Sequence, residues 1–156
     1  NPDNQIPDFK SYFKIFYDFL EVKPNQEVHF ELGRALVGQS ASLITRALYI
    51  KNGKKKNFVV LDAGMTELMR PALYQAYHKI ENLSQSKIAN RTSEIVKYDI
   101  VGPICESTDC FGKEVEQPES FRGDIFAIRS AGAYGEVMAS KYNLRDAIRT
   151  VYSSEV

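Results

Sequence analysis

Cysteine is scarce in this sequence, with two residues, Cys105 and Cys110, among 156. A disulfide framework needs several pairs, and no second pair is present to complete a zinc site. We therefore expect no disulfide framework and no metal site. Thiols of this kind stay free in a reducing compartment, so we expect a cytoplasmic location.

Long apolar runs and net charge are also lacking. No stretch approaches the roughly 18 apolar residues that a membrane span needs, and no signal peptide opens the chain. The 20 lysines and arginines balance the 20 aspartates and glutamates. Nucleic acids and membrane surfaces attract a basic excess, so we expect neither as a partner. The basic run 54–56 follows Asn52-Gly53 between two apolar runs, which is typical of a solvent-exposed hairpin tip.

The N-terminal part has the pattern of an α/β unit. Asp8 is a suitable N-cap for a helix that runs to about Glu21 and carries an aromatic face. Residues 27–31 alternate in polarity like a short strand, and Gly33 and Gly38 bracket a tight segment after it. One such unit cannot close a parallel sheet, so we expect the chain to begin late within a larger fold.

From Ser42 onward the pattern changes to that of a mostly antiparallel β domain. Apolar segments predict strands at 43–50, 58–61, 77–80, 95–101, 111–116 and 124–129. The lysine-rich hairpin joins the first two. Residues 84–93 are polar and predict a surface loop, whereas residues 133–140 predict a short helix.

The first candidate site is Glu31-Leu32-Gly33-Arg34, which follows the predicted strand. Active sites of α/β barrels are built at this edge of the sheet. Gly33 lets a ligand approach the backbone, and Arg34 offers a permanently charged fork for phosphate or carboxylate. Glu31 would suit a cationic ring nitrogen. An ordinary turn at the end of a strand has the same pattern and is the alternative.

The second candidate joins the segment Asp62-Ala63-Gly64-Met65 to Arg70 and Tyr74. Because Arg70 and Tyr74 are four positions apart, one helical turn places both on the same face. A guanidinium and a hydroxyl in that arrangement can hold one carboxylate. A surface arginine beside a half-buried tyrosine is the alternative interpretation.

Two further candidates lie in the C-terminal half. In Cys105-Glu106-Ser107-Thr108-Asp109, neighbouring carboxylates oppose ionisation of a thiol, so an activated nucleophile is not expected. The cluster better suits an ammonium group, with Glu106 as its counter-ion. In residues 130–135, small residues surround Tyr134 and allow its ring to reach a ligand. A polar loop and a structural turn are the respective alternatives.

In this order, the motifs E-x-G-R, D-A-G-M with R-P-A-L-Y, C-E-S-x-D and A-G-A-Y resemble the signature set of diaminopimelate decarboxylases. The resemblance covers nearly the whole chain, and R-P-A-L-Y with C-E-S-x-D is its specific part. Related basic amino-acid decarboxylases share the fold but usually have C-D-G or similar at the cysteine motif. One departure is Leu32, where the family usually has proline, and its effect is a slightly looser phosphate loop.

The resemblance implies a mainly β chain in two parts. Members of this family join an N-terminal β/α barrel, which holds pyridoxal 5'-phosphate, to a C-terminal antiparallel β-barrel or sandwich domain. Residues 1–38 would be the last helix, last strand and phosphate loop of the barrel, and residues 39–156 the C-terminal β domain.

The resemblance also implies a role for each candidate residue in contact with the cofactor. Glu31 would face the pyridine nitrogen and keep it protonated, which makes the ring an electron sink. Gly33 and Arg34 would bind the cofactor phosphate. Tyr134 would lie against both cofactor and substrate.

The implied reaction converts meso-diaminopimelate to L-lysine, the final step of lysine biosynthesis. Arg34, Arg70 and Tyr74 would hold the distal carboxylate of this small-molecule substrate, and Glu106 its distal ammonium. In this family Cys105 and Glu106 would reach the active site of the opposite subunit of a homodimer. Cys105 would then sit near the reacting carbon as a catalytic residue.

Two other interpretations stay open. One is a sister decarboxylase that acts on ornithine, arginine or carboxynorspermidine. The other is a non-catalytic β-domain interaction module that uses the same residues structurally. The two classes differ in whether Arg34, Arg70 and Tyr134 converge on one region of the folded chain.

The chain by itself is expected to show no decarboxylase activity and no cofactor absorbance. The family's cofactor-anchoring lysine has no counterpart here, since Lys10, Lys14 and Lys23 fall on or beside the predicted helix. The measurements are carbon dioxide release from diaminopimelate and the visible spectrum after addition of pyridoxal phosphate. A borohydride-reduced adduct on one specific lysine would contradict this expectation.

Overall fold

The structure, a computed structural model, describes residues 8–84 and 94–155. The chain divides into two compact units, Asn1–Leu32 and Gly33–Val156, which are described separately. The family boundary expected between residues 38 and 39 stays a prediction. No helix in the described ranges is long and apolar enough to cross a membrane.

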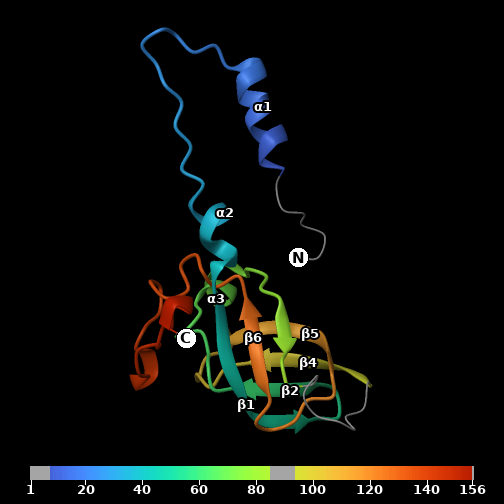
Figure 1. The fold of residues 1–156 in the computed structure, drawn as a ribbon. Coiled ribbons are helices and arrows are strands. Elements are labelled where there is room, and N and C mark those ends of the chain that lie inside the picture. The colour runs from blue at the N-terminus through green and yellow to red at the C-terminus, as the bar shows by residue number, and fades with distance from the viewer. Residues whose placement is uncertain (1–7, 85–93, 156) are drawn as a thin grey trace. The chain divides into compact units, whose positions relative to one another are not determined.

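The N-terminal unit contains one helix, α1 (Phe9–Phe19), as predicted (Figure 1). Asp8 caps it, because its Oδ1 accepts a hydrogen bond from the Lys10 N–H at 3.0 Å. The aromatic face of α1 packs on Phe30, whose ring centroid lies 4.8 Å from those of Phe13 and Phe16. This contact covers part of the apolar face that the sequence predicts for α1.

The strand predicted at 27–31 is wrong. The structure contains no strand over these residues. A strand needs a hydrogen-bonded neighbour, and within this unit the described residues offer only α1 beside the segment. The apolar side chain of Phe30 packs on α1, whereas its polar neighbours do not. The alternating pattern of this segment therefore comes from packing against a helix and not from a sheet.

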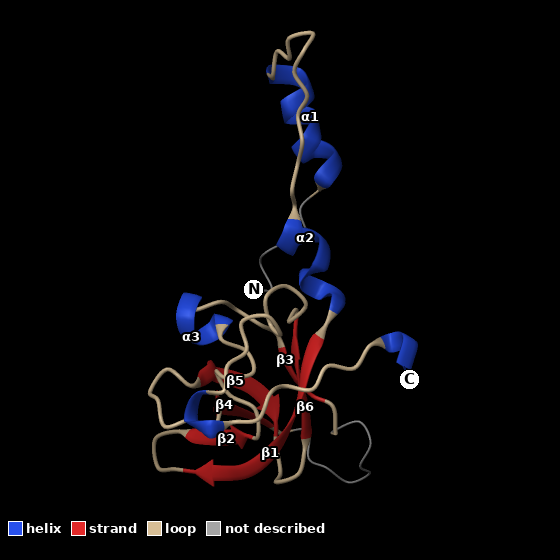
Figure 2. Ribbon diagram, turned by 90° about the vertical axis from the view of Figure 1, so that its left-hand side faces the viewer, coloured by secondary structure: helices blue, strands red, loops and turns tan. Residues whose placement is uncertain are grey.

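In its described residues, the C-terminal unit holds six strands and five short helical segments (Figures 1 and 2). The helical segments are α2 (Gly33–Val37), η1 (Gly38–Ser40), α3 (Arg70–Tyr74), η3 (Tyr142–Leu144) and η4 (Ser153–Glu155). The strands are β1 (Ser42–Asn52), β2 (Asn57–Leu61), β3 (Ile80–Asn82), β4 (Ile95–Val101), β5 (Cys110–Pro118) and β6 (Ile125–Arg129). They form one sheet in the order β3-β6-β1-β2-β4-β5. Every pair is antiparallel except β2 with β4.

Most predicted strands are confirmed, and the lysine-rich hairpin joins β1 to β2 with Asn52 opposite Asn57. A Cβ at Gly53 would lie 2.6 Å from Lys56 O, so the turn requires glycine. Lys56 of the hairpin is not simply solvated, as the sequence predicts, but forms an ion pair: its Nζ lies 2.9 Å from the buried Asp99 carboxylate on β4. This hydrogen bond raises the pKa of Lys56.

Two predicted elements differ from the structure. The strand expected at 77–80 begins at Ile80, because buried His78 instead donates from Nδ1 to Arg129 O at 2.8 Å. The helix expected at 133–140 is a series of turns, and the left-handed φ of +68° at Tyr134 interrupts any helical path. Of the loop expected at 84–93, only Ser84 lies within the described residues.

The two edge strands of the sheet, β3 and β5, are joined by the side chain of Gln117. Gln117 on β5, which is 8% exposed, donates from Nε2 to Ile80 O on β3 at 2.7 Å. Its Oε1 accepts from the Asn82 N–H at 3.3 Å. These side-chain bonds take the place of backbone hydrogen bonds between the edge strands β3 and β5. The sheet therefore forms a nearly closed barrel (Figure 2).

The interior of this barrel is the hydrophobic core. Many of its most buried side chains lie on β2, β4 and β6, and they include Leu61, Tyr98, Ile100, Phe126 and Ile128. Each large apolar side chain buried this way contributes about 1.5–3 kcal/mol. The fold class expected from the sequence, a mainly β chain, is confirmed.

Replacement of Gln117 by leucine is expected to lower the free energy of unfolding of this chain by about 1–3 kcal/mol, because Ile80 O and the Asn82 N–H lose their partner. Urea denaturation measures the loss, and amide exchange at Asn82 should accelerate. Glu116→Leu, on the neighbouring exposed position of β5, is the control and should change stability by less than about 0.5 kcal/mol. Equal effects of the two substitutions would show that the barrel does not depend on Gln117.

Candidate functional site

Arg70 lies between two tyrosine rings. Its guanidinium carbon is 5.4 Å from the ring centroid of Tyr74 and 5.8 Å from that of Tyr134. Arg70 and Tyr74 share a face of α3 because they are one turn apart, and Pro71 fits the first turn of that helix. The structure therefore brings together three residues that the sequence predicts for one site.

The Arg70 residue is largely buried and has no counter-ion among the described residues. The residue is 8% exposed, and among the described residues no carboxylate forms an ion pair with it. A buried charge is expensive unless it is paired. The two tyrosine faces offset part of this cost, and an anionic ligand would offset more.

Small residues hold the Tyr134 loop against the start of the unit. The Gly132 N–H donates to Gly38 O at 3.0 Å, and a Cβ at Gly132 would lie 2.1 Å from Val37 O. A Cβ at Gly135 would lie 2.3 Å from Ala131 O. Gly132 and Gly135 are thus needed for close packing of the backbone. The sequence suggests another role for these small residues, to leave open space around the Tyr134 ring.

Gly33 belongs to the same region as Tyr134. A Cβ built at Gly33 would lie 3.8 Å from the Tyr134 hydroxyl oxygen, so the space in front of the Gly33 backbone faces that hydroxyl. Arg34 follows on α2 and is exposed, with its Cγ beside Gly38. Glu31 is an exposed residue of the N-terminal unit, and its predicted role stays a prediction.

The carboxylate of Asp109 joins the two loops that carry the remaining motifs. It is 4% exposed and accepts from the Met65 N–H and the Ile104 N–H, both at 2.6 Å. A Cβ at Gly64 or Gly102 would come within 2.8 Å or 2.4 Å of its oxygens. Both positions therefore require glycine, and Asp109 fixes the backbone of both loops.

Burial raises the pKa of the Asp109 carboxyl, while the hydrogen bonds from Ile104 and Met65 act in the opposite direction. Its position at the end of the C-E-S-x-D motif is thus structural. The sequence groups Asp109 with Glu106 as a polar cluster, but only the fold shows that the two acids have different surroundings.

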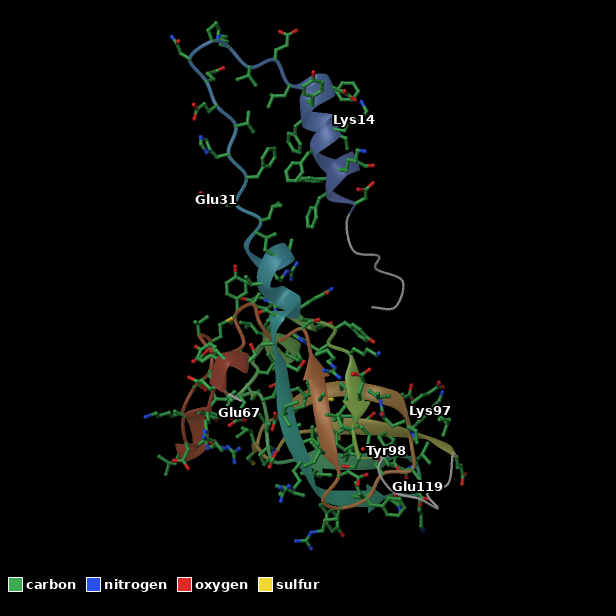
Figure 3. All side chains as sticks on the ribbon, in the orientation of Figure 1. Lys14, Glu31, Glu67, Lys97, Tyr98 and Glu119 are labelled. Carbon is green, nitrogen blue, oxygen red and sulfur yellow. The ribbon has the colours of Figure 1, made fainter. Side chains whose placement is uncertain are left out.

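A second buried acid, Glu67, was missed by the sequence-based reasoning. It accepts from the Gly64 N–H at 2.7 Å and from the Thr66 hydroxyl at 2.9 Å. Arg145 donates to its Oε1 at 3.3 Å from Nε and at 3.2 Å from Nη2, and also donates to Asp62 O. Figure 3 shows Glu67 beside the C-terminal segment. No local pattern connects residues so distant in sequence.

Cys105 and Glu106 lie on the exposed loop that follows Ile104. Cys105 and Cys110 are free thiols. The Glu106 Oε1 accepts from the Tyr142 hydroxyl at 2.6 Å. Within the described ranges, no cluster of histidine, cysteine or acidic side chains could hold a metal ion.

The family described as pyridoxal-dependent decarboxylase, C-terminal sheet domain, matches residues 15–132. A diaminopimelate decarboxylase of Bacteroides thetaiotaomicron is 54% identical over the whole chain, which spans 39% of that relative.

Two solved structures also resemble the chain. A crystal structure from Aquifex aeolicus has a TM-score of 0.82 at 38% identity, over 93% of this chain and 34% of its own. The diaminopimelate decarboxylase of Helicobacter pylori complexed with L-lysine has a TM-score of 0.63 at 47% identity, over 70% of this chain and 26% of its own.

Asp109→Asn is expected to lower the free energy of unfolding of this chain by about 1–3 kcal/mol. An asparagine can accept only through Oδ1, so its NH₂ group would face one of the two amides that Asp109 satisfies. Thermal unfolding measures the loss. Asp146→Asn, at an exposed position, is the control and should have little effect. If the two variants melt alike, Asp109 does not anchor the loops.

Proposed function

The chain belongs to the pyridoxal-dependent decarboxylases, and from this premise we propose that the protein that carries it converts meso-diaminopimelate to L-lysine. The support is the identity to relatives named diaminopimelate decarboxylase, one of which is described as complexed with L-lysine. Because the chain spans 39% of the Bacteroides relative, the activity is proposed for the complete protein.

The observation that carries this proposal is the buried Arg70. A permanent charge between the rings of Tyr74 and Tyr134, with no carboxylate partner among the described residues, suits a ligand that brings its own carboxylate. Diaminopimelate has a carboxylate at the end that does not react. Arg34, Arg70 and the Tyr74 hydroxyl are proposed to hold it. Arg70 lies over the Tyr134 ring, and Gly33, the residue before Arg34, lies beside the Tyr134 hydroxyl; both contacts favour this proposal over a β module without a ligand.

The residues near Gly33 fit pyridoxal phosphate. Gly33 has no side chain of its own and is exposed, and Arg34 beside it carries an exposed permanent charge that suits phosphate. Gly33 and Arg34 are proposed to bind the phosphate, Glu31 the ring nitrogen, and Tyr134 to lie against the ring. When bound, the cofactor supplies an electron sink for the carbon that loses carbon dioxide.

Glu106 and Cys105 are proposed to act in the active site of the opposite subunit of a homodimer. Support comes from their exposure on a loop whose backbone Asp109 fixes, because a residue that serves another subunit must lie at the surface. Glu106 would bind the distal ammonium, and Cys105 would lie near the reacting carbon. The free thiols support a cytoplasmic location for this enzyme.

Arg70→Met is expected to lower kcat/KM for diaminopimelate about 10- to 100-fold, because one charge-assisted contact is worth about 1.5–3 kcal/mol. The complete protein is assayed for L-lysine formation, with ornithine and arginine as competing substrates. Cofactor content should stay nearly unchanged, and stability should change little, because the substitution breaks no ion pair among the described residues. Arg34→Ala should in contrast also weaken cofactor retention.

Arg122→Met, an exposed arginine outside this region, is the control. Equal losses of cofactor in the Arg34 and Arg70 variants would contradict the roles assigned to them. A preference for ornithine or arginine over diaminopimelate would place the enzyme with the sister decarboxylases instead.

A further inference from the structure

The C-terminal segment 139–145 is attached at two points to the loop that precedes α3. The Ser140 N–H donates to Thr66 O at 2.9 Å. Arg145 binds the Glu67 carboxylate and Asp62 O. These contacts hold both sides of the short η3 turn (Tyr142–Leu144) to one loop.

The backbone between these attachments is strained. Asn143 and Leu144 both have φ of +57°, in the left-handed region that most side chains avoid. Leu144 is 99% exposed, so its own packing does not impose this conformation. Such strain persists only where the surroundings over-determine it, and it is often found at functional sites. Here the attached residues Ser140 and Arg145 lie on either side of the turn and limit the positions open to Tyr142.

Tyr142 uses this position to contact Glu106. Its hydroxyl donates to Glu106 Oε1 at 2.6 Å, and this bond raises the pKa of Tyr142. The Glu106 backbone is already fixed, since its N–H donates to Ile104 O at 2.8 Å and its carbonyl accepts from the Asp109 N–H at 3.1 Å. The orientation of the carboxylate is the freedom that remains, and the hydrogen bond from Tyr142 restricts it.

The two residues also line a cavity of about 240 Å³ with Met65, Met69, Thr108 and Ser140. The Ser140 Oγ is buried, and in the described part of the chain it has no hydrogen-bond partner. The wall of the cavity is thus partly apolar, with one unsatisfied hydroxyl and one acid. The hydroxyl of Tyr142 donates to Oε1 of Glu106, so Oε2 of Glu106 can accept a hydrogen bond from a cationic ligand.

We propose that Tyr142 is a positioning residue that orients the Glu106 carboxylate toward the distal ammonium of the substrate. The proposal rests on the proposed function, because it assumes that Glu106 binds this ammonium. Tyr142 and Glu106 belong to one chain, so they would enter the opposite subunit's active site as a unit that is already assembled.

The test measures KM and kcat in the complete protein for Tyr142→Phe, Glu106→Ala and the double variant. Each is assayed with meso-diaminopimelate and with 2-aminopimelate, which lacks the distal ammonium. Tyr142→Phe should raise KM for diaminopimelate about five- to tenfold, as loss of an oriented charge-assisted contact predicts, and leave kcat and the melting temperature unchanged. It should not change KM for 2-aminopimelate. The double variant should match Glu106→Ala alone.

Tyr152→Phe, an exposed tyrosine of the same C-terminal segment, is the matched control and should behave like the unsubstituted protein. If Glu106→Ala raises KM but Tyr142→Phe does not, the inference is wrong and the proposed function stands. Equal increases for both substrates, or additive effects in the double variant, would show that Tyr142 does not act through Glu106. If Glu106→Ala leaves KM unchanged, the proposed role of Glu106 fails and the inference fails with it.

Discussion

The buried carboxylate of Asp109 is the constraint on which the arrangement of the site depends. It satisfies the amides of Met65 and Ile104, and its oxygens occupy the space that side chains at positions 64 and 102 would need. An unsatisfied buried amide and a displaced acid are both costly, so the two loops can meet in few other ways. The loop that leads into α3 and the loop that presents Glu106 are consequently held as one body.

Near these two loops, a positive and a negative side chain lie in different surroundings. Arg70 is buried against aromatic faces, where a permanent cation is retained at a cost, whereas Glu106 lies at the surface with a tyrosine hydroxyl as its partner. A substrate with a carboxylate and an ammonium at its distal end matches this division. In the proposed homodimer, the acid would come from Glu106 of the other subunit.

Local patterns in the sequence predict the local parts of the structure. The cap at Asp8, the hairpin at Asn52-Gly53 and the one-turn spacing of Arg70 and Tyr74 depend on neighbours within a few residues, and each is found as expected. The predicted strand at 27–31 was wrong because alternating polarity also arises where an extended segment covers a helix. The predicted helix at 133–140 was wrong because glycine and a left-handed tyrosine serve backbone packing there.

What the sequence does not predict are contacts between distant residues. The bonds from Gln117 to β3, from Arg145 to Glu67 and from Tyr142 to Glu106 each join segments that no periodicity relates. Polar residues of these types are ordinary at surfaces, and only the fold shows which are buried or paired. The same holds for Asp109, whose importance follows from its contacts with Gly64 and Gly102 rather than from its own motif.

The parallel pairing of β2 with β4 has a consequence for how the barrel assembles. The β1–β2 hairpin closes a short loop, whereas β2 can pair with β4 only after all the chain between Leu61 and Ile95 has been placed. Closing a longer loop costs more chain entropy before any contact repays it, and parallel pairings of this kind form slowly. Folding kinetics should therefore be limited by the pairing of β2 with β4 and by the still longer closure of β1 with β6, with the β1–β2 hairpin as the early element. During that interval the β2 edge is the surface most open to pairing with another chain.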